Sequence, residues 1–177
     1  MTPLKIAALS AALSAALLPA LWLAGCKHHD PEQAPLSRSL YPEPGRAHAD
    51  LAAALSTAAA THKRVLLDFG GNWCGDCLVL DAYFHDPVNA HLLDSSYVLV
   101  DVNIGHMDAN LDLAAQYGVP LDKGVPALAV LDEHGQLVFS QKSGEFEDMR
   151  HMDPSSVKAF LAEWKPAAPC SSTTVTC

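Results

Sequence analysis

The spacing of apolar residues predicts alternating helices and strands from residue 47 to residue 164. Apolar side chains three and four positions apart predict amphipathic helices at both ends of this region. Short apolar runs between them predict buried strands. The expected elements, in order, are a helix at 47–62, a strand at 65–69, helices at 74–84 and 88–93, a strand at 97–102, a helix at 108–117, strands at 127–131 and 137–140, and a helix that starts at Asp153-Pro154. This order predicts parallel strands with crossover helices, followed by an antiparallel hairpin at the sheet edge.

The first 25 residues have the pattern of an export signal. Residues 6–25 carry no charge and follow Lys5, which is typical of a leader with a basic start and an apolar core. The run L-A-G-C that ends at Cys26 resembles the lipobox of bacterial lipoproteins, which implies cleavage before Cys26 and lipidation of its thiol. An uncleaved anchor helix is the alternative, because the apolar run is close to the length that spans a bilayer. Both interpretations place the folded part outside the cytoplasm, and Lys27 favours the outer membrane by the usual sorting pattern.

Composition divides the rest of the chain into three parts. Residues 26–45 contain four prolines and no apolar period, which predicts an extended tether. Residues 46–165 carry the predicted helices and strands and form one domain. Residues 166–177 form a tail that contains two cysteines.

The charge excludes two classes of function. The chain has 20 acidic against 11 basic residues and a formal net charge of −9. A nucleic-acid-binding protein needs clustered lysine and arginine against the phosphates, so no nucleic-acid partner is expected. The same balance argues against a polybasic protein that binds a membrane surface by charge.

The five cysteines fall into one lipidation site and two close pairs. Cys170 and Cys177 bracket six tail residues, and a structural disulfide is the plain interpretation in an exported protein. Cys74 and Cys77 instead follow a predicted strand, where a redox-active disulfide is expected.

Two alternatives for the Cys74/Cys77 pair are weaker. Half of a zinc site is one, but no second C-x-x-C exists and His85, His91 and His106 lack ligand spacing. A purely structural disulfide is the other, but closing so short a loop removes little chain entropy. No metal and no other cofactor is therefore expected.

The segment LLDFGGNWCGDC, the Gly124-Val125-Pro126 step before a strand, and the hairpin-then-helix ending together resemble the thioredoxin-like family. The resemblance covers about residues 46–165 and implies a three-layer α/β/α sandwich with a central mixed sheet. It is strongest to periplasmic members, including the C-terminal domain of the membrane electron transporter DsbD. The implied activity is thiol–disulfide exchange.

The chemistry of thiol–disulfide exchange assigns a role to each residue of the motif. Cys74 opens a predicted helix, where free backbone N–H groups and the helix dipole favour a thiolate, so it is the candidate nucleophile. Cys77 lies on the same helix face three residues later and is the candidate resolving thiol. By resemblance, Asp68 is the buried carboxylate below Cys77, with a pKa raised by burial so that it exchanges a proton with that thiol through water.

Three further residues are expected to bind substrate. Trp73 supplies an apolar wall beside the nucleophile, although simple packing is the alternative for this side chain. Pro126 is the candidate cis-proline, which leaves the Val125 backbone free to pair with an extended substrate strand. Pro120 competes with Pro126 for the cis bond, but Pro126 directly precedes a strand.

Two positions depart from the family pattern. Asp76 replaces the proline that is usual between the cysteines, and its charge is expected to oppose the Cys74 thiolate and favour a reductant. Asp101 stands near the place where thioredoxin has a lysine coupled to the buried aspartate, which weakens the proton-relay argument.

The function expected from the sequence is a lipid-anchored thiol–disulfide oxidoreductase on the periplasmic side of the cell envelope that reduces protein disulfides. Its expected partners are disulfide-containing envelope proteins and a membrane thiol electron donor, because a reductase in an oxidising compartment must be recharged. The alternatives are a disulfide oxidase or isomerase, a non-catalytic binding module and, more distantly, a copper-delivery protein.

Overall fold

The computed structural model describes residues 39–167. The predicted leader, Cys26 and the Cys170/Cys177 pair lie outside these residues. In chain order the elements are η1 (Pro44–Arg46), α1 (Ala47–Thr61), β1 (Arg64–Gly70), α2 (Gly75–Phe84), α3 (Pro87–Ser96), β2 (Tyr97–Asn103), α4 (Leu111–Gln116), η2 (Leu121–Lys123), β3 (Ala127–Leu131), β4 (Leu137–Ser140), η3 (Met149–His151) and α5 (Ser155–Glu163). Within residues 39–167, every helix is too short or too polar to span a lipid bilayer.

The strands form a four-stranded mixed sheet in the order β2-β1-β3-β4. β1 and β2 are parallel, and β3 and β4 form an antiparallel hairpin, as the sequence predicted. The sequence did not indicate that β3 also runs antiparallel to β1. The end of β2 and the start of β3 lie at the same end of the strands, so the start of β3 lies beside the end of β1. This topology brings Pro126 to the cysteine pair.

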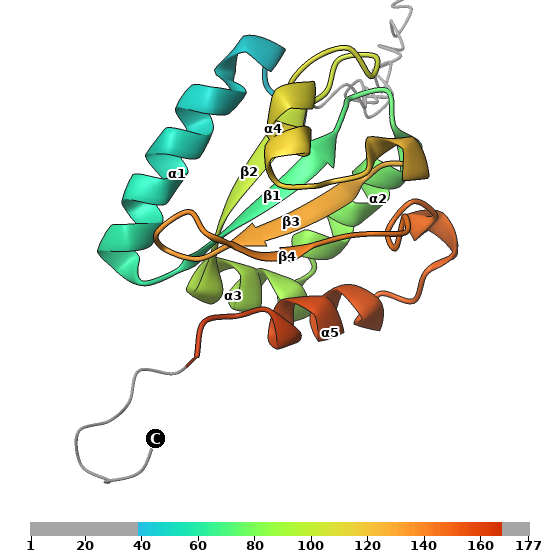
Figure 1. Cartoon of the computed structure of the whole chain (residues 1–177). Helices are drawn as coiled ribbons and strands as arrows, with labels where there is room; N and C mark the ends of the chain where they lie inside the picture. Colours follow the sequence, from blue (N-terminus) through green and yellow to red (C-terminus); the bar gives the residue numbers. More distant parts are fainter. Residues whose placement is uncertain (1–38, 168–177) are drawn as a thin grey trace, which may run out of the picture. The chain divides into compact units, whose positions relative to one another are not determined.

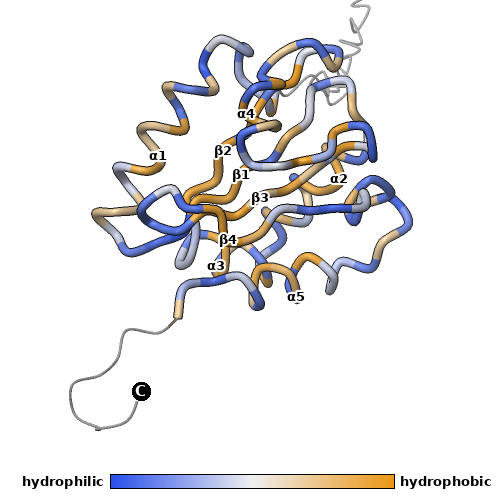
Figure 2. The backbone as a smooth tube through the Cα atoms, viewed as in Figure 1, coloured by the Kyte–Doolittle hydropathy of each residue, from blue (hydrophilic) through white to orange (hydrophobic). Residues whose placement is uncertain are grey.

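The sheet is the middle layer of a three-layer sandwich. Helices α1 and α4 cover one face, and α2, α3 and α5 cover the other (Figure 1). Successive residues of β1 point to opposite faces, so Leu67 packs with α1 and α4 whereas Leu66 packs with α2 and α5. Figure 2 shows the hydrophobic residues concentrated in the strands. The expected α/β/α fold is therefore confirmed.

The helix boundaries follow from local capping. Cys74 is the N-cap of α2, and the Asp86 side chain accepts a hydrogen bond from the Val88 N–H to cap α3, with Pro87 in the first turn. α4 is shorter than the predicted 108–117 because Asn110 adopts a left-handed conformation with φ of 54° just before the helix begins. Helical continuation toward residue 108 is thereby excluded.

The described chain begins with a segment that packs on the domain. The sequence assigned residues 26–45 to a tether, but Tyr41 is only 2% exposed and its main chain is bonded to Asn72. η1 follows directly and leads into α1. Burial of an aromatic ring stabilises a folded core, and an extended tether buries none. The folded domain therefore starts earlier than residue 46.

Candidate redox-active site

Cys74 and Cys77 form a disulfide at the start of α2, with Cα atoms 5.2 Å apart. The Sγ of Cys74 accepts a hydrogen bond from the Cys77 backbone N–H at 3.1 Å. Cys74 is 5% exposed, whereas Cys77 is fully buried. Free N–H groups and the helix dipole favour an anion at this position. The geometry makes Cys74 the sulfur that a partner reaches first and Cys77 the one behind it.

The Val125–Pro126 peptide bond is cis and faces the disulfide. The Val125 carbonyl oxygen lies 3.6 Å from the Sγ of Cys74. Of the two prolines considered from the sequence, Pro126 has the cis bond and Pro120 does not. The Val125 backbone therefore lies where an extended polypeptide can pair with it as its disulfide approaches Cys74.

Trp73 stands at the edge of the site, with 49% of its surface exposed. Its indole N–H donates a hydrogen bond to the Gly105 carbonyl, and its ring stacks on His106 with ring centroids 6.2 Å apart. These contacts hold an apolar ring in place while half of it faces solvent. His106, which has no metal-ligand spacing in the sequence, thus supports the Trp73 ring that precedes Cys74.

Asp68 lies on β1 and is 2% exposed. Its Oδ2 accepts a hydrogen bond from the Tyr41 hydroxyl at 2.8 Å, and its Oδ1 has no partner among the described residues. Burial raises the pKa of Asp68 well above its ordinary value, the neighbouring Asp101 adds to this, and the Tyr41 bond partly offsets it. Asp101 is directly opposite in the parallel register, and burial raises its own pKa to about 6.

Comparison with known proteins places this arrangement in a family. A family model described as thioredoxin-like matches residues 46–133. The crystal structure of a disulphide isomerase from Xylella fastidiosa Temecula1 is 33% identical, with a TM-score of 0.68, and the alignment covers 72% of this chain and 97% of that one. The chain belongs to the thioredoxin-like family. A thioredoxin-like fold with a C-x-x-C disulfide identifies it as a thiol–disulfide oxidoreductase.

Other matches are more distant. A DsbH oxidoreductase is 24% identical with a TM-score of 0.46, over 63% of this chain and 81% of that one. A thioredoxin from Thermus thermophilus is 21% identical with a TM-score of 0.46, over 70% of this chain and 83% of that one. The comparison with curated proteins found no match.

Two residues that the sequence did not indicate complete this thioredoxin-like site. Tyr41 donates to Asp68, and Asn72 binds the Tyr41 main chain twice: its Oδ1 accepts from the Tyr41 N–H at 3.0 Å, and its Nδ2 donates to the Tyr41 carbonyl at 2.9 Å. Tyr41 lies 27 residues before Asp68 in a proline-rich stretch. No local periodicity marks such a contact.

The charge of Asp76 is compensated, which corrects the expectation that it acts alone on Cys74. Arg150 binds the Asp76 carboxylate through its side chain at 3.0 and 2.9 Å and through its backbone N–H at 3.0 Å. These hydrogen bonds and the guanidinium charge hold the pKa of Asp76 below its ordinary value. Arg150 lies 74 residues away, on η3, and the sequence did not indicate it. Asp76 therefore stays ionised, with a cation beside it.

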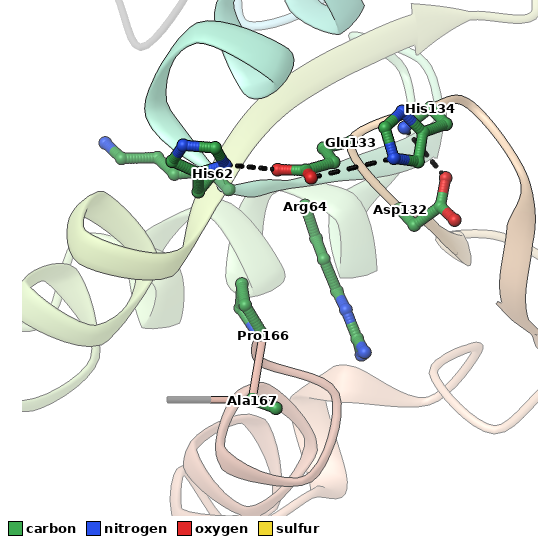
Figure 3. A pocket seen from close by; sticks show the side chains of 8 residues that line it. His62, Arg64, Asp132, Glu133, His134, Pro166 and Ala167 are labelled. Carbon is green, nitrogen blue, oxygen red and sulfur yellow. Dashed lines mark hydrogen bonds and ion pairs between the residues drawn. The ribbon is translucent and has the colours of Figure 1, made fainter. Parts of the chain in front are cut away.

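The opposite end of the sheet contains a cavity of about 470 Å³. His62, Arg64, Glu133 and His134 are among its lining residues, and Glu133 lies between the two histidines (Figure 3). Residues 39–167 contain no group of three or more potential ligands placed to hold a metal ion. The cavity lies at the start of β1, whereas the cysteines follow its end.

Proposed function

We propose that the protein is a lipid-anchored thiol–disulfide oxidoreductase of the cell envelope that reduces protein disulfides. The observation that carries this proposal is the Cys74–Cys77 disulfide at a helix N-terminus, next to the Val125 backbone and the cis bond to Pro126. The export-signal pattern and the lipobox before Cys26 support the location.

In the proposed reaction, a substrate strand lies along Val125 and its disulfide meets Cys74. The Cys74 thiolate attacks one substrate sulfur, so a mixed disulfide forms and the other substrate sulfur leaves as a thiolate. The Cys77 thiol gives its proton to Asp68 and attacks Cys74. The second substrate sulfur is released, the Cys74–Cys77 disulfide forms, and two electrons have passed to the substrate.

Carboxyl groups near the cysteines support the reducing direction. Asp68 is buried and is bonded to the Tyr41 hydroxyl, whose ring packs with Cys77, and Asp76 lies in the first turn of α2. A negative charge disfavours a thiolate and so favours the disulfide over the dithiol, which makes the dithiol the better electron donor. Arg150 offsets part of the charge of Asp76, and Asp68 opposes a nearby thiolate only when it is ionised.

The proposed partners follow from the compartment. Disulfide-containing envelope proteins are the substrates, because disulfides persist in an oxidising environment. A membrane thiol carrier reduces the Cys74–Cys77 disulfide back to the dithiol, because a reductase in an oxidising compartment must be recharged. Lys27 supports an outer-membrane anchor.

Disulfide isomerisation is the second candidate function, because the relative that is 33% identical is described as a disulphide isomerase. An isomerase uses the same two cysteines but leaves the number of substrate disulfides unchanged. The first attack by Cys74 is common to both reactions, so the distinction depends on how often Cys77 completes the reduction.

The equilibrium of the Cys74–Cys77 pair with glutathione tests the direction. A reductase is expected to have a potential near about −270 mV, as in a reducing thioredoxin, and a value near about −120 mV, as in a strong periplasmic oxidant, contradicts it. Insulin reduction and the refolding of scrambled ribonuclease then separate reductase from isomerase. Insulin reduction that survives in both Cys74→Ser and Cys77→Ser excludes catalysis by this pair.

A further inference from the structure

Tyr41 connects the first described segment to the interior of the site. Its ring is buried against Cys74 and Cys77, and its hydroxyl donates to the Oδ2 of Asp68 at 2.8 Å. The main chain of Tyr41 is fixed by two hydrogen bonds with Asn72. Asn72 itself stands two positions before Cys74. A side chain held at both its backbone and its tip has a defined position.

The absence of a side chain at Gly70 makes room for this arrangement. A Cβ atom added to Gly70 would collide with the hydroxyl oxygen of Tyr41 and would lie 2.7 Å from the Sγ of Cys77. The phenol oxygen and the resolving sulfur therefore face each other across the same small space at the end of β1. The hydroxyl thus lies near both the proton donor and the proton acceptor of the resolving step.

The two oxygens of Asp68 differ in their surroundings. Oδ2 accepts the Tyr41 hydrogen bond, whereas Oδ1 is buried with no partner among residues 39–167. A hydrogen bond donated to a carboxylate stabilises its charged form, which is the form that accepts a proton. Without it, Asp68 would be a buried carboxyl with no hydrogen-bond donor, which strongly disfavours ionisation.

We propose that Tyr41 is a positioning residue that holds Asp68 by Oδ2 and leaves Oδ1 as the atom that takes the proton from Cys77. The proposal rests on the proposed thiol–disulfide exchange and names a residue that acts through Asp68. In the step concerned, the S–H bond of Cys77 breaks, its proton goes to Asp68, and the sulfur electron pair forms the bond to Cys74 as the substrate thiolate leaves.

The groups that face Asp68 come from three elements. Tyr41 reaches it from the segment before η1, Asp101 faces it from β2, and Cys77 and Asp81 belong to α2. The β3 partner in register is apolar. Asp101 and Asp81 oppose ionisation of Asp68, and Tyr41 favours it. Removal of the Tyr41 hydroxyl is therefore expected to raise the pKa of Asp68, so that Asp68 becomes able to accept the Cys77 proton only at higher pH.

The test separates the two chemical steps with dithiobis(nitrobenzoate), a small aromatic disulfide. The chain carries Cys26→Ser, Cys170→Ser and Cys177→Ser and is first reduced to the Cys74/Cys77 dithiol. Attack by Cys74 then releases one coloured thiolate, and attack by Cys77 on the mixed disulfide releases a second. For Tyr41→Phe, we expect the rise in the rate of the second phase with pH to occur at higher pH than in the unsubstituted protein. At neutral pH that phase becomes about tenfold slower, the size expected from one hydrogen bond to a charged group. The first phase stays unchanged.

Tyr97→Phe is the matched control. The Tyr97 hydroxyl is also buried and donates at 2.8 Å, but its acceptor is the Leu161 carbonyl. We expect Tyr97→Phe to lower stability without moving the pH profile. In an Asp68→Asn background, Tyr41→Phe is expected to cause no further shift, because the two residues act as one unit.

Three results overturn the proposal. They are equal slowing at every pH, a shift that persists in the Asp68→Asn background, and the same shift in Tyr97→Phe. If Tyr41→Phe does not fold, Asn72→Ala removes the backbone contacts but keeps the phenol, and it is expected to give a smaller shift in the same direction. If the unsubstituted pair shows no second phase at all, the proposed function fails, which is a different outcome from failure of the Tyr41 role.

Discussion

The two ends of β1 carry polar side chains in different settings. At its carboxyl end, Asp68 is 2% exposed and bonded to a residue far away in the chain. At its amino end, the imidazole of His62 is 83% exposed and pairs with Glu133. The cavity lies at the amino end of β1, and the disulfide lies at its carboxyl end. Both pairs join residues far apart in the chain, so the two ends differ in the burial of their polar groups, and the site proposed to be reactive is the buried one and not the one with the cavity.

The largest effect is expected for Cys74→Ser, which removes the proposed nucleophile. Insulin reduction should fall to the rate seen without the protein, because Cys77 is fully buried and cannot replace it. Turbidity of reduced insulin measures this loss. Cys77→Ser is the control, because it should keep the first attack and accumulate a mixed disulfide visible by mass spectrometry. Full activity of Cys74→Ser would show that the reaction does not take place at the carboxyl end of β1.

The next largest effect is expected for Asp68→Asn, which removes the proposed proton acceptor. The resolving step should slow by about a hundredfold at neutral pH, a typical contribution of a general base. Rapid-mixing absorbance with an aromatic disulfide measures it. A variant as fast as the unsubstituted protein would show that Cys77 loses its proton directly to solvent.

Asp68→Asn also predicts a change in how stability depends on pH. The folded-state pKa of Asp68 is raised, so the folded protein holds a proton that the unfolded chain releases at acidic pH. Stability contributed by this group is present at low pH and is lost as pH rises through the raised pKa. Urea unfolding between pH 5 and pH 8 should therefore show a smaller decline in Asp68→Asn than in the unsubstituted protein. Equal declines in both proteins would contradict a raised pKa of the Asp68 carboxyl in the folded state.

A smaller effect is expected for Arg150→Gln. Asp76 then lies near Cys74 without its cation, the thiolate becomes less favourable, and alkylation of reduced Cys74 at neutral pH should slow by about threefold, as for a partly exposed ion pair. Peptide mass spectrometry after brief iodoacetamide treatment measures the rate. The double variant Asp76→Asn with Arg150→Gln should restore it, and a double variant as slow as the single one would remove the electrostatic explanation.

The smallest effect is expected at the cavity end. His62→Ala removes an exposed pair with Glu133, so the free energy of unfolding should change by no more than about 0.5 kcal/mol. Insulin reduction should stay the same, and thermal unfolding alone should register the substitution. A large loss of insulin reduction would show that the two ends of β1 are coupled.

Local patterns in the sequence were sufficient for most of the fold. The apolar periods of α1 and α5, the short strand runs and the Asp86-Pro87 cap each depend on neighbouring residues, and the structure has these elements close to the predicted bounds. The reversed direction of β3 could not be predicted in this way, because it depends on how the chain passes from β2 to β3.

The candidate site shows the same division. Cys74, Cys77 and Pro126 are marked by short motifs, and the structure brings them together. Tyr41 and Arg150 act across 27 and 74 residues, where sequence patterns carry no signal. Their partners Asp68 and Asp76 were recognisable, but what each carboxylate is bonded to, and hence its state of charge, required the packed structure.

The hydrogen bonds of the first described segment have a practical consequence for shortening the protein. A version cut at residue 46, where the sequence places the domain boundary, would keep every strand and every α-helix found in residues 39–167. It would nevertheless lose Tyr41 and the Pro44 carbonyl that accepts from the Asn110 side chain, so a correctly folded fragment would have an emptied space under Gly70 and a carboxyl group without its donor. Activity measured on such a fragment would therefore not represent the enzyme with its complete site.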